Sequence, residues 1–197
     1  MPRRLLQCNI NVRVAVLLWV ALKRRNQRVE AKHMTEVFPA PDHNHERCAA
    51  DVIAHAVSVC ADRSQRLTPM RRKVLEVLAS SHKPLGAYEI IDAAASGGPR
   101  PAPITIYRAL DFLMENGLVH RIESRNAFLA CAHNHASGAV VAFLICESCG
   151  DVGEAPGNDI SATLSAAAGS AGFRPKMSVV EITGTCAHCS EQRAAQT

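Results

Sequence analysis

The chain has 197 residues, of which 48% are hydrophobic, 4% aromatic and 20% charged, and its formal net charge is +4. This length is long for one ordinary domain and suits two small ones, each of which buries little surface by itself. Eight cysteines could indicate a secreted disulfide scaffold, but four stand in two matched pairs and the others are scattered (Cys8, Cys48, Cys60 and Cys131). We therefore predict a two-domain protein of a reducing compartment, the cytoplasm.

The N-terminal segment differs from the rest of the chain. Residues 1–33 hold eight basic residues and one acid around an apolar run from Val14 to Leu22. That run is shorter than the roughly 20 residues that span a bilayer, and Lys23-Arg24-Arg25 stands where a signal peptide has small residues. We predict no membrane role and expect residues 1–45 to be a disordered extension, of which 1–33 come from an upstream start site. Without residues 1–33 the formal charge would be −3, so any binding to nucleic acid would have to depend on a local basic patch and not on net charge.

Four short helices and a β-hairpin are predicted from residue 46 to residue 132. Ile53, Ala56, Val57 and Cys60 share one face of the first helix, and Thr68-Pro69 marks the start of the second. The remaining expected elements are the end of the second helix near Ser80, a third helix over 87–95, a fourth between Pro103 and Gly117, and strands over 118–124 and 127–131. Helices followed directly by a strand pair are the layout of a winged helix.

Three side chains near the start of the fourth helix could contact DNA. Thr105 and Arg108 lie away from the apolar stripe of this helix, with Tyr107 beside them. A recognition helix enters the major groove by its first turns, although a solvated helix face would look the same. Residues 63–125 hold ten basic residues against six acidic ones, which favours DNA binding.

A second set of residues around the hairpin could bind a metal ion. A two-residue turn at Arg125-Asn126 would place His120 directly opposite Cys131, with Cβ atoms about 4.5–5.5 Å apart. His133-Asn134-His135 follows Cys131, and Glu154 comes soon after the first cysteine pair. Histidine, thiolate and carboxylate ligands together favour zinc over iron(II) or manganese.

Two cysteine pairs in the C-terminal half have the spacing of a structural zinc site. Cys146 and Cys149 form one pair and Cys186 and Cys189 the other, so that each pair puts two sulfurs on one tight turn. The long segment over 150–185 implies secondary structure between the halves of the site.

The segment between these pairs predicts a small α/β unit. We expect a strand over 140–145, a helix with Ile160, Leu164 and Ala168 on one face, and a strand over 177–182. A sheet of this size leaves an apolar face exposed unless a second subunit covers it, which predicts a homodimer.

Several of these motifs, in this order, resemble one protein family. The run ITIYRALDFL (104–113), continuing as GLVHRIES (117–124), resembles the recognition helix and wing of the ferric uptake regulator superfamily. The run FLICESCG (143–150) with the late Cys186-x-x-Cys189 resembles its zinc-sensing branch, the zinc uptake regulators. The resemblance covers roughly residues 46–190 and includes several motifs, which makes it far more specific than any one of them.

The resemblance implies an α+β fold with a winged helix-turn-helix domain (46–132), a hinge (133–139), a small α/β dimerisation domain (140–190) and a tail (191–197). It implies two zinc ions per subunit, a structural one on the four paired cysteines and a regulatory one at the hinge. The implied regulatory ligands are His120, Cys131, His135 and Glu154, with His133 as the alternative to His135. In the family, residues matching Tyr107 and Arg108 contact DNA, and helix geometry adds Thr105.

The expected function is that of a zinc-responsive transcriptional repressor that binds palindromic double-stranded operator DNA as a dimer and controls zinc uptake genes. The alternative is an iron-, manganese- or peroxide-responsive regulator of the same superfamily. We do not expect an enzyme, because the His-x-Glu and Pro-Cys-x-x-Cys signature of zinc deaminases is absent.

Overall fold

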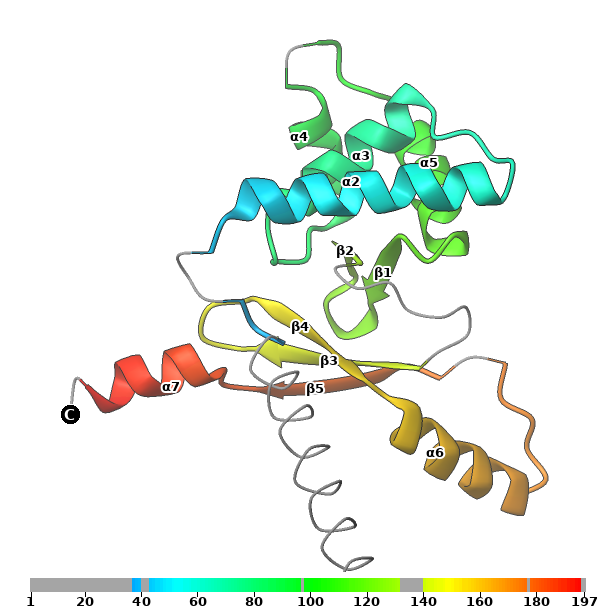
Figure 1. Ribbon diagram of the computed structural model, residues 1–197, viewed down its shortest axis with the longest axis vertical. Coiled ribbons are helices and arrows are strands. Elements are labelled where there is room, and N and C mark those ends of the chain that lie inside the picture. The colour runs from blue at the N-terminus through cyan, green and yellow to red at the C-terminus, as the bar shows by residue number, and fades with distance from the viewer. Residues whose placement is uncertain (1–36, 40–42, 97, 132–139, 177, 196–197) are drawn as a thin grey trace, which may run out of the picture. The chain divides into compact units, whose positions relative to one another are not determined.

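The computed structural model divides into two compact units, Met1–Val37 and Phe38–Thr197. It describes residues 37–39, 43–96, 98–131, 140–176 and 178–195, nearly all of them in the second unit (Figure 1). The predicted origin and disorder of residues 1–33, the hinge at 133–139 and the alternative ligands His133 and His135 lie outside these residues.

Four helices form the N-terminal half of the second unit, as the sequence predicted. They are α2 (His45–Asp62), α3 (Pro69–Ala79), α4 (Ala87–Ala94) and α5 (Pro103–Glu115). Their apolar faces meet in one core, whose largest fully buried members include Leu75, Leu78, Ile90, Ile106, Leu110 and Leu113. Helix α3 begins at Pro69 as expected, but the Thr68 side chain makes no capping hydrogen bond. After α5, Gly117 adopts a φ of +70°, a left-handed conformation that glycine tolerates best.

The start of α2 corrects one expectation. His45 is the first residue of the helix, and the Asn44 side chain accepts a hydrogen bond from the Arg47 amide at 3.0 Å, a regular N-cap. His43 is hydrogen-bonded to His82, so His43 and His45 belong to the folded unit and not to a disordered extension.

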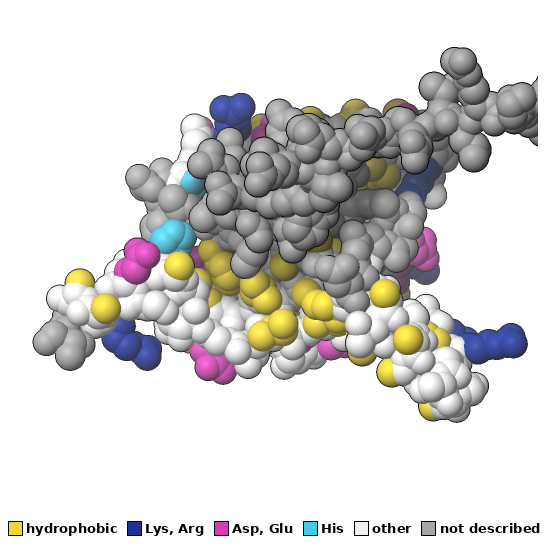
Figure 2. All heavy atoms as spheres, turned by 60° about the horizontal axis from the view of Figure 1, so that its bottom comes forward, with side chains coloured by type: hydrophobic (Ala, Val, Ile, Leu, Met, Phe, Trp, Pro, Cys, Tyr) yellow, Lys and Arg dark blue, Asp and Glu magenta, His cyan; other side chains and the backbone are white. Residues whose placement is uncertain are grey.

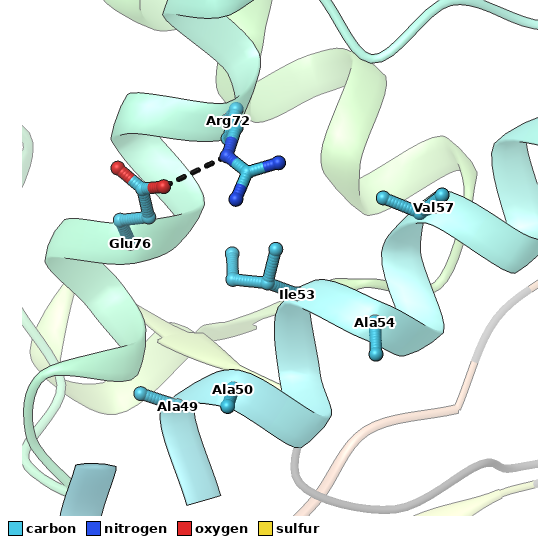
Figure 3. A pocket seen from close by; sticks show the side chains of 7 residues that line it. All are labelled: Ala49, Ala50, Ile53, Ala54, Val57, Arg72 and Glu76. Carbon is cyan, nitrogen blue, oxygen red and sulfur yellow. Dashed lines mark hydrogen bonds and ion pairs between the residues drawn. The ribbon is translucent and has the colours of Figure 1, made fainter. Parts of the chain in front are cut away.

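The predicted buried face of α2 is also only partly correct. Ala56 and Cys60 are buried in the core, whereas Val57 is 49% exposed. Val57 lines a groove between α2 and α3, in which the α3 residues Arg72 and Glu76 form an ion pair at 2.9 Å (Figure 3). Val57 follows buried Ala56 directly and lies about 100° from it around the helix, so Val57 is at the margin of the buried face and lines this groove.

A β-hairpin follows α5 and completes a winged helix. Strands β1 (Val119–Ile122) and β2 (Ala127–Ala130) pair antiparallel, and Leu85 before α4 forms an isolated bridge with Phe128. The turn between the strands is longer than the two residues expected, because Glu123–Arg125 form a 3₁₀ turn and Asn126 is left-handed at φ +46°.

The register of this hairpin is therefore two residues away from the predicted one. His120 pairs with Leu129, and the Cys131 amide donates to the Leu118 carbonyl at 3.0 Å. The prediction that His120 lies directly opposite Cys131 is wrong. Side chains alternate with a period of two, so a slip of two residues keeps both on one face as diagonal neighbours.

The C-terminal half contains a three-stranded sheet of order β4-β3-β5. Strand β3 (Val141–Cys146) pairs antiparallel with β4 (Val152–Pro156) and parallel with β5 (Val180–Gly184). Helix α6 (Asn158–Ser170) connects β4 to β5, and α7 (Ala187–Ala194) follows β5. The sequence did not predict β4 or α7, and α7 continues past the expected end of the domain at residue 190.

The two faces of this sheet have different surroundings. On one face Val141, Phe143 and Ile145 of β3 pack against Ile122 and Leu129 of the hairpin. Leu144 and Ile182 are paired residues of β3 and β5 on the other face, and Ile182 is 50% exposed. Figure 2 shows hydrophobic side chains gathered on the surface seen from the sheet side of the molecule.

The predicted fold class is confirmed: a winged helix precedes a small α/β domain in an α+β chain. Among the described residues, no helix combines the length and the apolar character that a bilayer crossing requires.

Candidate metal centres

The four paired cysteines come together at one end of the sheet. One sulfur atom from each of Cys146, Cys149, Cys186 and Cys189 lies within 4.8 Å of the others. The Sγ atoms of Cys149 and Cys186 are 4.0 Å apart. Four sulfurs at about 2.3 Å from a tetrahedral zinc ion would be about 3.8 Å from one another, so the spacing fits zinc closely.

Local backbone structure explains how these cysteines converge. Cys146 ends β3, and the Gly150 amide donates to its carbonyl at 3.0 Å, closing a tight turn around Cys149. Gly150 has a φ of +84°, a conformation that a side chain would strain. On the other side, Cys186 is the N-cap of α7 and Cys189 lies in its first turn. The positive end of a helix favours thiolates.

The ionisation of this cluster also points to a cation. Burial alone would raise the pKa of Cys146, but hydrogen bonds from the backbone amides of Cys149, Cys186 and Ser148 lower it to about 6. Burial and the neighbouring Cys146 sulfur raise the pKa of Cys149. Like charges at this distance oppose one another, and a positive ion among the sulfurs would offset that repulsion.

A second cluster lies where the hairpin meets the sheet. His120 comes from β1, Cys131 directly follows β2, and Glu154 belongs to β4. The Cys131 Sγ atom is 3.7 Å from Oε2 of Glu154, and Nε2 of His120 is 4.0 Å from its Oε1. One ligand atom of each residue lies within 4.8 Å of the others, so the structure brings together three of the four predicted regulatory ligands.

The pairing of the sheet aims Glu154 at this cluster. Glu154 pairs with Phe143, whose side chain faces the hairpin, and the rings of Phe143 and His120 have centroids 5.1 Å apart. Cys131 and Glu154 are both buried, with 4% and 5% of their surface exposed. A carboxylate is costly to bury beside a thiol, and a divalent cation bound by both would offset that cost. This donor set fits zinc.

A third cluster was not predicted from the sequence. His43, Cys48 and His82 bring one ligand atom each within 4.8 Å of the others. His43 and Cys48 flank the start of α2, and His82 lies between α3 and α4. The spacing His43-x-His45-x-x-Cys48 was the available signal, but nothing in the sequence indicated that His82 lies beside it.

The predicted DNA-contacting residues lie together on the outer surface of α5. Thr105, Tyr107 and Arg108 are all exposed, whereas Ile106 and Ala109 between and beside them are buried. Ile104 in the first turn of α5 is also exposed, at 58%. Behind α5, the Arg71 guanidinium stacks 3.4 Å from the centre of the Phe112 ring and helps to fix α5 against α3.

Comparison with known proteins agrees with this architecture. Residues 62–183 match the family model described as the ferric uptake regulator family. The chain is 35% identical over 146 residues to the zinc uptake regulation protein of Escherichia coli strain K12, an alignment that covers 74% of this chain and 85% of that protein. It is 28% identical over 130 residues to a peroxide-responsive repressor, PerR, of Staphylococcus epidermidis, with 64% of this chain and 83% of that protein aligned.

Two solved structures resemble the fold and the sequence together. A zinc uptake regulator complexed with zinc and DNA superposes with a TM-score of 0.68 at 34% identity, covering 74% of this chain and 97% of that one. A structure of holo XcZur superposes with a TM-score of 0.66 at 41% identity, covering 72% of this chain and 98% of that one. With the winged helix, the paired cysteines and the mixed cluster in place, the chain belongs to the ferric uptake regulator family, in its zinc uptake regulator branch.

Proposed function

We propose that this protein is a zinc-responsive transcriptional repressor that acts in the cytoplasm and controls zinc uptake genes. In this proposal it binds two zinc ions per subunit and, when loaded, binds palindromic operator DNA as a homodimer. It is a regulator and not an enzyme, in keeping with its family.

The observation that carries the proposal is the cluster of His120, Cys131 and Glu154. Two of these residues belong to the wing hairpin and the third to the sheet. An ion bound by all three would tie the winged helix to the C-terminal domain. We assign the fourth ligand to His135, with His133 as the alternative; both follow Cys131 within four residues of sequence.

The cysteine cluster has a different task in this proposal. It lies at the C-terminal end of β3 and joins β3 to α7. Four thiolates hold zinc tightly and leave no open position, which suits a permanent structural ion. Two basic side chains, Lys83 and Arg125, lie beside Gly150 and would balance the net negative charge of a zinc ion with four thiolates.

The exposed residues of α5 provide the proposed DNA surface. Arg108 can contact phosphate or a guanine edge, and Tyr107 and Thr105 can donate hydrogen bonds in the major groove. In a dimer, two such helices must reach successive major grooves, about 34–36 Å apart along the DNA.

The second face of the sheet supports the proposed dimer. Leu144 and Ile182 form an apolar pair there, and Ile182 is 50% exposed. A related copy of this face would cover these side chains.

Zinc response then follows from a shift between conformations. Without the hinge ion the winged helices can adopt several orientations, and DNA binding bears the cost of selecting one. His120, Cys131 and Glu154 would hold the zinc ion, and a bound ion would favour one of these orientations. Linkage requires that operator DNA tightens zinc binding by the same factor by which zinc tightens DNA binding.

The test is a titration of operator binding against buffered free zinc, with iron(II) and manganese as controls. Zinc alone should produce high-affinity binding at low free concentration. Activation by iron or manganese instead would mean that the protein is an iron- or manganese-responsive regulator of the same superfamily. Loss of binding only after peroxide treatment would support the alternative of a thiol-based peroxide sensor.

A further inference from the structure

We propose that His43, Cys48 and His82 form a third zinc site, in the winged-helix half of the molecule. The site shares no residue with the cysteine cluster or with the cluster of His120, Cys131 and Glu154. It therefore requires ligands and an ion beyond those of the proposed function.

Geometry is the first support for this site. The Nε2 atoms of His43 and His82 are 2.9 Å apart, and the Cys48 sulfur completes a group whose ligand atoms all lie within 4.8 Å of one another. Nitrogen ligands at about 2.0–2.1 Å from a tetrahedral zinc ion are about 3.3–3.4 Å apart. The two imidazoles need to separate by only a few tenths of an ångström to hold zinc between them.

The folding of the chain explains why these residues meet. The Asn44 carbonyl accepts a hydrogen bond from the Cys48 amide at 3.3 Å, so the first turn of α2 holds Cys48 near the residues that precede the helix. His82 lies in the connection between α3 and α4, and its own carbonyl accepts from the Val152 amide at 3.1 Å. The segment that carries the His82 imidazole is therefore anchored to β4 through its backbone.

His45 supplies a second, independent observation. Its ring stacks on that of His82, with centroids 4.6 Å apart and planes at 12°. Its Nδ1 atom is buried, yet it has no hydrogen-bond partner among the described residues. A buried ring nitrogen with unused capacity, on a ring beside the imidazoles of His43 and His82, is the candidate fourth ligand.

The chemistry of the donors selects the ion. Two imidazoles and a thiolate favour zinc over manganese or magnesium, which prefer oxygen ligands.

The position of the site gives it a structural consequence. It would tie the start of α2 to the α3–α4 connection, and that connection is hydrogen-bonded to the first residue of β4, the strand that carries Glu154. Zinc in this site would therefore stiffen the part of the winged helix that contacts the sheet.

Elemental analysis of the full chain, reduced and equilibrated with buffered zinc, tests the site. Cys48→Ser and His43→Ala should each bind one zinc ion fewer per chain than the parent. The matched control is His55→Ala, which removes a histidine from the same helix outside the cluster and should keep the parent's zinc content. Equal zinc content in the parent and in both site variants would overturn the proposal.

Two further measurements separate this result from misfolding and from the proposed regulatory site. When both proteins are loaded with cobalt, Cys48→Ser should show weaker thiolate-to-cobalt absorption than the parent. The helical circular dichroism of the two proteins should be the same. The double variant Cys48→Ser/Cys131→Ser should lose two ions, since each cysteine serves its own site. Loss of only one ion in the double variant would mean that Cys48 and Cys131 share a site. That result would refute a separate third zinc site and would leave the proposed regulatory site standing.

Discussion

The sulfur of Cys131 lies 3.7 Å from Oε2 of Glu154, although 23 residues separate them in sequence and they belong to different halves of the molecule. This contact joins the end of the wing hairpin to β4 within the buried cluster that also contains His120. A metal ion held by both residues would couple the orientation of the winged helix to zinc.

Cys131→Ser should remove zinc-dependent operator binding and leave a folded dimer. The hydroxyl of serine is a poor zinc ligand, so the affinity gained on zinc addition, about 5–150-fold for a typical allosteric coupling, should disappear. Operator binding measured with and without buffered zinc checks this, and Cys60→Ala, a cysteine change in the core of α2, is the control. Normal zinc-responsive repression by Cys131→Ser would rule out the sensor role of this cluster.

Cys146→Ser should prevent the C-terminal domain from folding. Structural zinc sites contribute about 10–16 kcal/mol of apparent binding free energy, which matches or exceeds the about 5–15 kcal/mol of total stability of a small domain. The variant also loses the sulfur atom that accepts a hydrogen bond from the Cys186 amide at 3.3 Å. Limited proteolysis should cut it after β5, where the parent resists, and Cys131→Ser is the control for the same chemical change at another thiol. Protease resistance and a full zinc content in Cys146→Ser would contradict the structural role.

Much of the fold followed from local signals in the sequence. Local chemistry explains the positions of Pro69, Gly117 and the cysteine pairs, because each acts through its own backbone or ligand properties. Three features therefore lie where they were expected: α3, α5 and the cysteine cluster. The register of the hairpin depended on its turn, and the 3₁₀ turn over Glu123–Arg125 has no simple sequence signature. The cluster of His120 with Cys131 survived this error because the slip was an even number of residues.

Other features depended on tertiary pairing and could not be predicted. Strand β4 contains Gly153 and Pro156, residues with low strand propensity, and is defined by its pairing with β3. No local signal in the sequence marks His82, and only the folded chain places it beside His43. The ligand role of His133 or His135 and the DNA contacts of α5 stay predictions.

Glu181→Gln should weaken the attachment of the wing to the sheet. The Glu181 carboxylate accepts hydrogen bonds from the amides of Glu123 at 2.7 Å and Ser124 at 3.1 Å. Partial burial would raise the pKa of Glu181, but a hydrogen bond from the Ser124 side chain, together with those from the two amides, holds the pKa below its ordinary value. The variant keeps one neutral acceptor, so the free energy of unfolding should fall by about 1 kcal/mol.

The pH dependence of this effect has a definite sign. A carboxyl group with a lowered folded pKa stabilises the protein above its unfolded pKa, and this contribution is lost as the pH falls through the folded pKa. The difference in unfolding free energy between the parent and Glu181→Gln should therefore be largest near neutral pH and shrink in acid. A difference that is constant across this range would show that the charge of Glu181 contributes nothing.

Arg108→Ala should weaken operator binding by about 1–3 kcal/mol, which is roughly 5- to 160-fold in affinity. Arg108 is exposed on α5 next to Tyr107, so the substitution should leave the fold intact. If Arg108 contacts a phosphate, the slope of log affinity against log salt concentration should also decrease in magnitude by about one. Arg174→Ala removes the same charge from an exposed position in the C-terminal half and should leave both quantities unchanged. Equal affinities for the two variants would mean that α5 is not the recognition helix.

Ile182→Glu should convert the dimer into monomers. Ile182 is half exposed and lies beside Leu144 on the sheet face away from the hairpin, so a dimer formed through this face would bury the new carboxylate. An uncompensated buried charge costs several kcal/mol, and two symmetric copies would meet at the interface. Sedimentation of the zinc-loaded protein measures the outcome. Tyr88→Glu places the same charge on another large exposed side chain, 71% exposed on α4, and should sediment as the parent does. Because two half-sites must be bound together, monomeric Ile182→Glu should also lose operator affinity, and a variant that stays dimeric would move the interface to another face.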